Sequence, residues 1–389
     1  MKEHIAALHK KHYERNPEWF YFAPGRVNLI GEHIDHSGGT VLPMAIQHGI
    51  YAAVSPRIDQ SFRVFSEEFP KEGVQTITLD ALDYQDDVGF LNYVKGVMTT
   101  FGREGCRLDR GLDITIASDL PAGAGLSSSA AFTLLVAYLL DDVHRFQLGS
   151  RKLIRMARYV ENVYLRLNTG IMDQYIIANA KAGHALKIDT KLAEHEAIPF
   201  NEDALTLILM NTNKKRTLLD SNYNKRVRKL KEAEWHFERY RPIEKLCDLD
   251  VDTFKALRDT FKNQSQLKLV EHVIFENDRA KKAAKALKEE DYAMLGMFMD
   301  QSHDSLRYLY EVSIDELDFL VEANRELGAV GARLTGAGFG GSMIALYEKA
   351  KVPNNFDRLR TDYERLFNRE LDIRTVHPVA GVHRLEGAF

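Results

Sequence analysis

The order of apolar and polar positions along the chain predicts a mixture of strands and helices. In the first half, short runs rich in β-branched and aromatic residues at 50–54, 62–65 and 112–117 are typical of strands. Apolar positions with a helical period follow at about 127–145 and 151–168. Strands and helices do not alternate strictly in this order, which favours an α+β fold over a doubly wound sheet.

The second half has the same mixed character. Its predicted elements, in chain order, are a strand at 205–211, a charged helix at about 218–240, a pair of helices over about 264–301, a helix at about 314–327 and a strand at 342–347. At 389 residues the chain exceeds the usual size of one core, so we expect two domains with a cleft between them. No repeat or Gly/Ser tether marks the boundary, which we place near residues 190–204, with domains at 1–195 and 196–389.

Composition and charge narrow the range of partners. With 45% hydrophobic and 28% charged residues, the chain has the composition of an ordinary globular protein. A formal net charge of −4 provides no basic field for nucleic acid or an anionic membrane, and the basic run at 225–231 is more typical of a solvated helix face. The longest apolar stretch, 130–140, is far shorter than the roughly 20 residues of a membrane helix. We therefore expect no nucleic acid and no membrane as partner.

The chain start and the cysteines bear on location. The first 20 residues alternate charged and apolar positions, unlike a signal peptide, and predict a surface helix. The two cysteines, Cys106 and Cys247, lie outside any paired Cys or His spacing. This pattern indicates neither a disulfide framework nor a zinc site, so we expect a cytoplasmic protein.

The first segment that carries chemistry is PGRVNLIGEHIDHSGG at 24–39. Here Arg26, Glu32, His33 and Asp35 crowd hydrogen-bonding side chains among glycine-containing turns, without an amphipathic period. Such a set can donate to and accept from several hydroxyls at once, as a polyol ligand requires. A solvated loop whose charges pair with one another is the alternative interpretation.

The second segment is DLPAGAGLSSSAA at 119–131, which precedes a helix predicted to begin near Ser127. Gly123 and Gly125 allow a tight turn with inward N–H groups, and the helix adds its positive N-terminal end, so the segment can cradle an anion. It lacks the lysine of a Walker A loop, and Ser129 stands where a dinucleotide motif would end in glycine. A strand-to-helix turn with serine caps is the alternative.

The third segment is LTGAGFGGS at 334–342, in which four of six successive positions are glycine. Such density indicates close approach of the backbone to a ligand or to another loop. A plain turn or bulge would explain it equally well.

Two carboxylates stand out by position. At about 100° per residue, Glu161 falls on the apolar side of the helix predicted at 151–168, whereas Arg166 and other basic residues fall on the opposite side. An inward carboxylate needs a cation or strong donors, so Glu161 is a candidate for the Mg²⁺ site, with a structural salt bridge as the alternative. Asp173 opens an apolar helical stretch at 171–180, where an acidic residue is commonly a dipole partner.

Together, PGRVNLIGEH, LPAGAGLSSSAA and LTGAGFGG have the order and rough spacing of the three motifs of the GHMP kinase superfamily. Within it the chain resembles the galactokinases through EHIDHSGG, GIMDQ at 170–174, MNTNKKR at 210–216 and DSNYNKR at 220–226. The resemblance covers about residues 20–385. It implies a two-lobed α+β fold, with a ribosomal-protein-S5-like N-terminal lobe, a ferredoxin-like C-terminal lobe, and sugar and nucleotide in the cleft.

The resemblance also implies roles for individual residues. Asp173 would be the catalytic carboxylate and Arg26 the cation beside it. The sugar would bind to Glu32, His33, Asp35, Gly170 and Tyr223. The nucleotide would bind to Ser66 and to the phosphate loop, comprising Gly123, Ala124, Gly125, Leu126, Ser127, Ser128 and Ser129. The implied cofactor, Mg²⁺, would be held by Ser129 and Glu161.

The implied reaction is MgATP-dependent phosphorylation of the anomeric C1 hydroxyl of galactose, which yields galactose 1-phosphate and ADP. Asp173 would accept the hydroxyl proton and Arg26 would stabilise charge on the transferring group. Galactose and ATP are the expected partners, and we expect a monomer.

Other members of the superfamily provide the alternatives. One is a kinase for N-acetylgalactosamine, arabinose or mevalonate, and another is a non-catalytic galactose sensor on the same fold. Tyr223 and the set of Glu32, His33 and Asp35 favour a sugar over mevalonate. The intact serine-rich helix start together with Asp173 favours catalysis over sensing.

The first motif departs from the family pattern. Galactokinases usually read EHTDYNGG, whereas Ile34, His36 and Ser37 replace Thr, Tyr and Asn in this chain. The substitutions could be neutral, could change the pocket shape or its pH response through His36, or could mark a shifted sugar preference.

Overall fold

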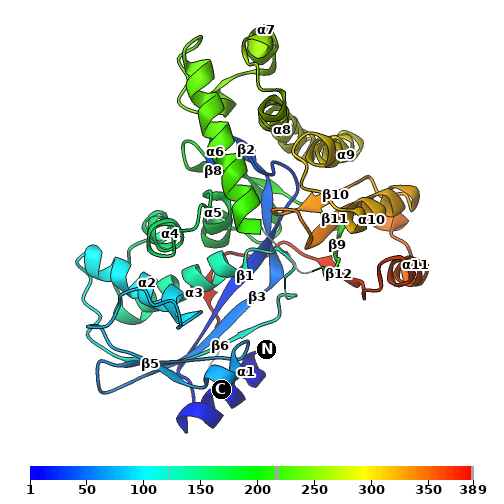
Figure 1. Cartoon of the computed structure of the whole chain (residues 1–389). Helices are drawn as coiled ribbons and strands as arrows, with labels where there is room; N and C mark the ends of the chain where they lie inside the picture. Colours follow the sequence, from blue (N-terminus) through cyan, green and yellow to red (C-terminus); the bar gives the residue numbers. More distant parts are fainter. Residues whose placement is uncertain (122, 215–218, 387–389) are drawn as a thin grey trace.

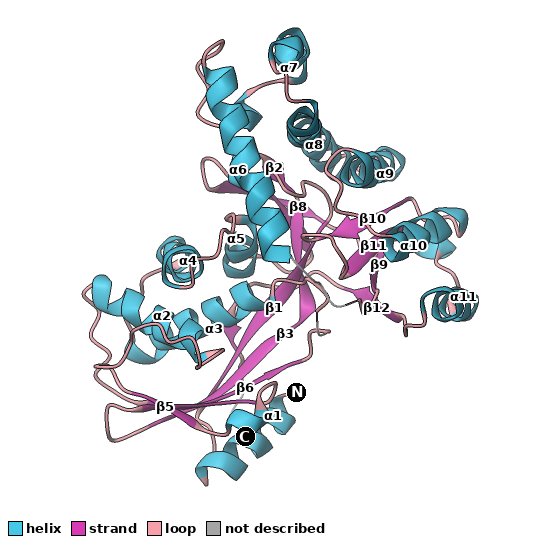
Figure 2. Cartoon of the chain, viewed as in Figure 1, coloured by secondary structure: helices cyan, strands magenta, loops and turns pink. Residues whose placement is uncertain are grey.

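The computed structural model describes residues 1–389 except 122, 215–218 and 387–389. The described chain forms two lobes, each built on a β-sheet with helices packed against it (Figures 1 and 2). The α+β prediction is confirmed. No helix among the described residues is long and apolar enough to cross a membrane.

The N-terminal lobe is built on a six-stranded sheet with the order β13-β1-β3-β6-β4-β5. Its strands are β1 (Trp19–Asn28), β3 (Pro43–Pro56), β4 (Phe62–Ser66), β5 (Gln75–Ile77), β6 (Leu112–Ser118) and β13 (His383–Arg384). Helices α2 (Leu91–Arg103), α3 (Ser128–His144) and α4 (Ser150–Tyr159) lie on one side of this sheet and α1 (Lys2–Tyr13) on the other (Figure 1). A small sheet of β2 (Thr40–Val41), β7 (His184–Asp189) and β8 (Glu194–Pro199) and the helix α5 (Met172–Asn179) complete the part nearest the second lobe.

The C-terminal lobe contains an antiparallel sheet with the order β10-β11-β9-β12. Its strands are β9 (Leu205–Asn211), β10 (Gly331–Thr335), β11 (Ser342–Glu348) and β12 (Asp372–Val376). The central strands are apolar on both faces, as expected for a sheet covered on both sides. The helices of this half are α6 (Leu219–Glu238), α7 (Val251–Leu257), α8 (Gln264–Lys288), α9 (Tyr292–Tyr308), α10 (Asp315–Glu326) and α11 (Asp357–Phe367).

Among the described residues, the predicted elements correspond to observed ones except in one region. Residue 218, where the predicted helix at 218–240 begins, lies outside the described residues. The helix predicted at 151–168 is wrong in its second half, because α4 ends at Tyr159 and a π-helical turn at Val160–Tyr164 follows. After that wider turn, Asn168 contacts Asn224 of α6 at 3.0 Å. The chain end also returns to the first sheet, where β13 pairs with β1. The division at residues 195 and 196 stays a prediction.

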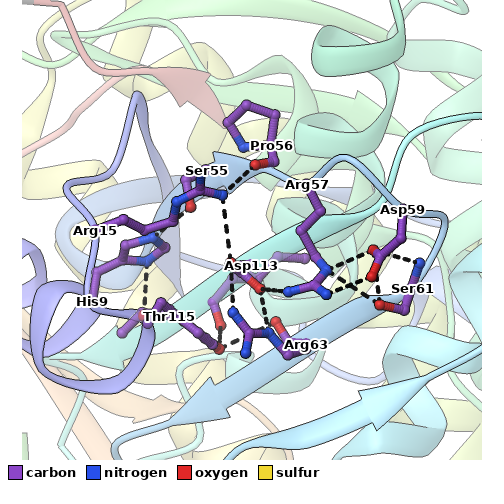
Figure 3. Close-up of polar contacts among 12 residues, drawn as sticks. His9, Arg15, Ser55, Pro56, Arg57, Asp59, Ser61, Arg63, Asp113 and Thr115 are labelled. Carbon is purple, nitrogen blue, oxygen red and sulfur yellow. Dashed lines mark hydrogen bonds and ion pairs between the residues drawn. The ribbon is translucent and has the colours of Figure 1, made fainter.

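The N-terminal helix, predicted as a surface helix, is fixed to the sheet by a buried polar cluster (Figure 3). Asp113 on β6 is fully buried and accepts hydrogen bonds from Arg57 at 3.0 Å and Arg63 at 2.6 Å. His9 on α1 lies between the hydroxyls of Thr115 and Ser55, and burial lowers its pKa to about 4. A neutral His9 therefore attaches α1 to the sheet at ordinary pH.

Candidate active site

A cavity of about 480 Å³ lies where the two lobes meet, and all three glycine-containing segments contribute to its wall. The predicted site residues that line it are Arg26, Glu32, His33, Asp35, Gly123, Ala124, Gly125, Leu126, Ser127, Ser128, Ser129, Gly170, Asp173 and Tyr223. Segments far apart in sequence therefore form one site.

Two predicted residues do not line the cavity. Ser66 is buried at the end of β4, where it pairs with Ile116 of β6. Its role as a nucleotide contact stays a prediction. Glu161 lies behind the wall and reaches the cavity through hydrogen bonds with Thr169 and Gln174, which both line it.

Arg26 and Asp173 form the charged centre of the cavity. Nε and Nη2 of Arg26, on β1, donate to the two carboxylate oxygens of Asp173 on α5 at 2.8 and 3.1 Å. Nη1 donates to the carbonyl of Gly125 at 2.8 Å, and the hydroxyl of Ser127 also donates to Asp173. The Arg26 side chain is 6% exposed and that of Asp173 is 30% exposed. The carboxylate is therefore held by two neighbours yet remains accessible from the cavity.

Glu32 is held by the third glycine-rich segment. Its Oε1 accepts from the amide of Gly336 at 2.6 Å and lies 3.8 Å from Nη1 of Arg333, while Oε2 accepts from the side chain of Asn28. Burial raises the pKa of Glu32, and the charge of Arg333 opposes that rise. The third segment thus positions a carboxylate of the first one.

Asp35 packs directly against Gly170. A Cβ atom added to Gly170 would lie 1.7 Å from Oδ2 of Asp35, so this approach requires glycine. Oδ2 accepts from the Met172 amide at 3.2 Å, and Nδ1 of His36 lies 3.6 Å from Oδ1. Burial acts to raise the pKa of Asp35, but His36 and the Met172 amide outweigh it, so this pKa lies below its usual value. Asp35 is thus an ionised acceptor at neutral pH.

Aromatic rings complete this end of the cavity. The ring of His33 stacks on Tyr310 with centroids 4.5 Å apart, and the ring of Tyr223 lies 5.9 Å away. Burial lowers the pKa of His33 well below its usual value, and Nε2 of His33 has no hydrogen-bond partner among the described residues. Burial also raises the pKa of Tyr223, which keeps its hydroxyl protonated. A neutral imidazole and a phenol are both suited to sugar hydroxyls.

The serine-rich loop joins β6 to α3 and turns through left-handed backbone conformations. Gly123, Gly125 and Ser127 have φ values of 68°, 74° and 63°. Ser342 of the third segment donates to the carbonyl of Ala124 at 2.9 Å, so the other lobe holds the loop in place. The first turn of α3 leaves unpaired N–H groups at the cavity, which gives the loop the character of an anion site.

Glu161 is 1% exposed and lies in the π-helical turn. Its Oε2 accepts from Thr169 at 2.9 Å and Gln174 at 2.5 Å, whereas Oε1 makes no hydrogen bond with a described residue. Burial and the charge of Asp173 raise its pKa to about 7, although Thr169, Ser129 and Gln174 oppose the rise. A buried carboxylate oxygen without a donor beside the phosphate loop fits a site for Mg²⁺.

Sequence reasoning missed several residues of the cavity wall. They are Leu120, Pro121, Arg166, Leu167, Asn168, Thr169, Met172, Gln174, Asn224, Gly336 and Ala337. The glycine density around Gly336 was the available signal for the third segment. No periodicity could place Arg166, because the wall at 166–170 depends on the π-helical turn.

Comparison with known proteins shows which class of protein has this architecture. Residues 92–181 match the family described as GHMP kinases N terminal domain, and residues 283–365 match GHMP kinases C terminal. A mevalonate kinase crystal structure, 18% identical, has a TM-score of 0.65 over 93% of this chain and 99% of that one, which shows a shared fold. The class of protein is therefore a GHMP kinase, an ATP-dependent small-molecule kinase.

Closer relatives define the family within this class. Residues 7–56 match the galactokinase galactose-binding signature. A galactokinase of Clostridium perfringens is 40% identical over 87% of this chain and 88% of its own, and one of Bacillus subtilis is 37% identical over 95% of both. The crystal structure of Lactococcus lactis galactokinase complexed with galactose, 33% identical, has a TM-score of 0.95 over 99% of this chain and 100% of that one. This chain belongs to the galactokinase family and is an ATP-dependent sugar kinase.

Proposed function

We propose that this protein transfers the γ-phosphoryl group of ATP to the C1 hydroxyl of galactose, releasing galactose 1-phosphate and ADP. The observation that carries the proposal is the Arg26–Asp173 pair, which lies in one cavity with a polyol-binding set and a phosphate loop. Galactokinase family membership fixes the expected acceptor.

Galactose would bind at the end of the cavity that contains Glu32, His33 and Asp35. The buried carboxylate of Glu32 and the partly buried one of Asp35 supply acceptors, and the neutral ring of His33 and the hydroxyl of Tyr223 can each donate or accept. Gly170 supports this set by leaving space for Asp35. These contacts orient the sugar so that its C1 hydroxyl faces Asp173.

In the transfer step, Asp173 accepts the proton of the C1 hydroxyl as that oxygen bonds to the γ-phosphorus. The bond between phosphorus and the β–γ bridging oxygen breaks, and ADP leaves with the electron pair. Arg26 fixes the carboxylate through two hydrogen bonds and places positive charge beside the transferring group. Positioning and charge stabilisation supply most of the rate in such reactions.

The phosphates of ATP would bind to the loop at 123–129 through backbone amides and serine hydroxyls. Glu161 and Ser129 would hold Mg²⁺, which neutralises phosphate charge when bound. Glu161 supports this role because its second carboxylate oxygen has no donor among the described residues.

The deciding experiment measures ADP release by the purified protein with MgATP and galactose, N-acetylgalactosamine, arabinose, glucose, mevalonate or no acceptor. Asp173→Asn should lower kcat with galactose by about 10²- to 10⁴-fold and change both KM values little, because it removes the proton acceptor but preserves shape. Asp203→Asn is the control, since the side chain of Asp203 is fully exposed on the surface.

Preference for another sugar would show that the protein is a related kinase with a different acceptor. It would also indicate that Ile34 and His36 change the sugar specificity. Saturable galactose binding without ADP release would indicate a sensor. Location in the cytoplasm and a monomeric state are also part of the proposal, and cell fractionation and light scattering would test them.

A further inference from the structure

Arg166 occupies an unusual backbone conformation in the wall of the cavity. It follows the π-helical turn, has a φ of 57° and lines the cavity next to Thr169 and Gly170. Left-handed φ values disfavour a side chain with a Cβ atom, so glycine or asparagine is usual at such positions. Strained residues of this kind cluster at functional sites.

Charge distinguishes Arg166 from the rest of the wall. The described wall residues include two cations, Arg26 and Arg166, and three carboxylates, Glu32, Asp35 and Asp173. Arg26 is already bound to Asp173. Arg166 is exposed and makes no ion pair or side-chain hydrogen bond with any described residue.

This distribution creates an electrostatic problem for the proposed substrate. A triphosphate that enters this cavity meets three carboxylates; Arg333 already faces Glu32 and Arg26 is bound to Asp173, so neither cation is free for the phosphates. The exposed guanidinium of Arg166 in the same wall would add positive charge to that of the proposed Mg²⁺ and can form paired hydrogen bonds to phosphate oxygens.

The loop that carries Arg166 is fixed on both sides. Before Arg166, the backbone N–H of Leu165 donates to the carbonyl of Val160 at 2.8 Å. Thr169 is bound to Glu161 and Asn162, and Asn168 donates to Asn224 of α6 at 3.0 Å. The backbone of Arg166 is therefore set by its neighbours, while its side chain remains free to reach a ligand. Arg145, at the end of α3, has the same conformation with a φ of 58° but does not line the cavity, so conformation alone does not make a site.

We propose that Arg166 is a phosphate-binding residue that contacts the α- and β-phosphates, which ATP and ADP share, in the cavity that the loop at 123–129 also lines. The proposal rests on the proposed kinase function and adds one residue to its nucleotide site. It assigns the ligand by chemistry, because a free guanidinium in an acid-rich cavity selects a polyanion over a neutral sugar.

The test compares Arg166→Gly with Arg145→Gly. Glycine relieves the left-handed strain in both variants, so neither should lower the midpoint of thermal unfolding. Calorimetric titration of ADP, with and without Mg²⁺, should show about tenfold weaker binding for Arg166→Gly, because one charge-assisted contact is lost. The ADP affinity of Arg166→Gly should also depend less steeply on NaCl concentration than that of the unaltered protein. The galactose affinity of the two proteins should be equal. Arg145→Gly should match the unaltered protein throughout.

Unchanged ADP affinity and salt dependence in Arg166→Gly would overturn the proposal. An equal loss of galactose and ADP affinity together with a lower unfolding midpoint would also overturn it, because that result would show that Arg166 only stabilises the folded loop. The ADP titration needs no sugar turnover, so it decides the role of Arg166 even where galactose phosphorylation itself fails.

Discussion

At the residue scale, the buried carboxylate of Glu161 supports the proposed Mg²⁺ site. Its burial and its unpartnered Oε1 fit a cation site better than a structural salt bridge, because no described cation pairs with it. Glu161→Gln should therefore raise the Mg²⁺ concentration for half-maximal turnover by about 10- to 100-fold. Titration of activity with Mg²⁺ at saturating ATP and galactose measures this change. Glu104→Gln, which alters an exposed partner of Lys152, should leave the Mg²⁺ requirement unchanged. An unchanged requirement in Glu161→Gln would assign Glu161 to packing.

Gly170 permits a second prediction at the same scale. The Cβ atom of alanine at 170 would overlap Oδ2 of Asp35, so Gly170→Ala must displace that carboxylate. We expect galactose affinity to fall roughly tenfold or more, since one buried contact of this kind contributes about 1–3 kcal/mol. Gly102→Ala is a matched control on α2, where an added Cβ meets no atom within 4 Å. Calorimetry with galactose tests both, and unchanged affinity in Gly170→Ala would remove Asp35 from the sugar site.

At the scale of elements, the buried carboxylate of Asp113 on β6 joins this strand to Arg63 on β4 and to Arg57, which follows β3. Asp113→Asn would leave Arg57 and Arg63 without their shared carboxylate in a buried cluster (Figure 3). Breaking a buried pair from one side typically costs about 3–5 kcal/mol, so the free energy of unfolding should fall by that order. Asp59→Asn, which removes an exposed partner of Arg57, should cost far less. Urea unfolding measures both, and equal effects would show that burial of Asp113 carries no special weight.

Elements also show what the sequence could and could not predict. The helix at α3 and the strands β9 and β11 follow from periodicity, because each buries one continuous apolar set. The π-helical turn at Val160–Tyr164 does not, since its local pattern still has a helical period and only the backbone hydrogen bond from the N–H of Leu165 to the carbonyl of Val160 shows the wider turn. The helical period therefore places Arg166 on a polar helix face, whereas in the structure it lines the cavity.

At the scale of the whole molecule, buried polar groups join the two lobes. The pairing of these groups cannot be predicted from local sequence patterns, because the partners are far apart in the sequence. Glu276 of α8 accepts from the amide of Gly31 at 2.9 Å, and His272 lies 3.1 Å from the carbonyl of Glu32. Arg333 of β10 donates to the carbonyl of Asn28 at 3.0 Å and faces Glu32. The resemblance to galactokinases indicates which residues are expected to bind sugar, but only the fold shows that groups of the second lobe contact one of them, Glu32.

Arg333 permits a prediction at this scale, because it is fully buried and belongs to the lobe opposite Glu32. Arg333→Met would remove the charge that opposes the raised pKa of Glu32, so Glu32 would take up a proton more readily and lose its strength as an acceptor. Galactose affinity should then fall about tenfold or more, and the loss should grow as pH decreases from 8 to 6, because a further raised pKa makes protonation of Glu32 more extensive at lower pH. ADP affinity should change much less, because no hydrogen bond of Arg333 reaches the phosphate loop among the described contacts. Titration of each ligand across this pH range separates the two sites, and Arg333→Lys should restore part of the galactose affinity by returning the charge. Parallel losses for both ligands, without a pH dependence, would show instead that Arg333 only holds the lobes together.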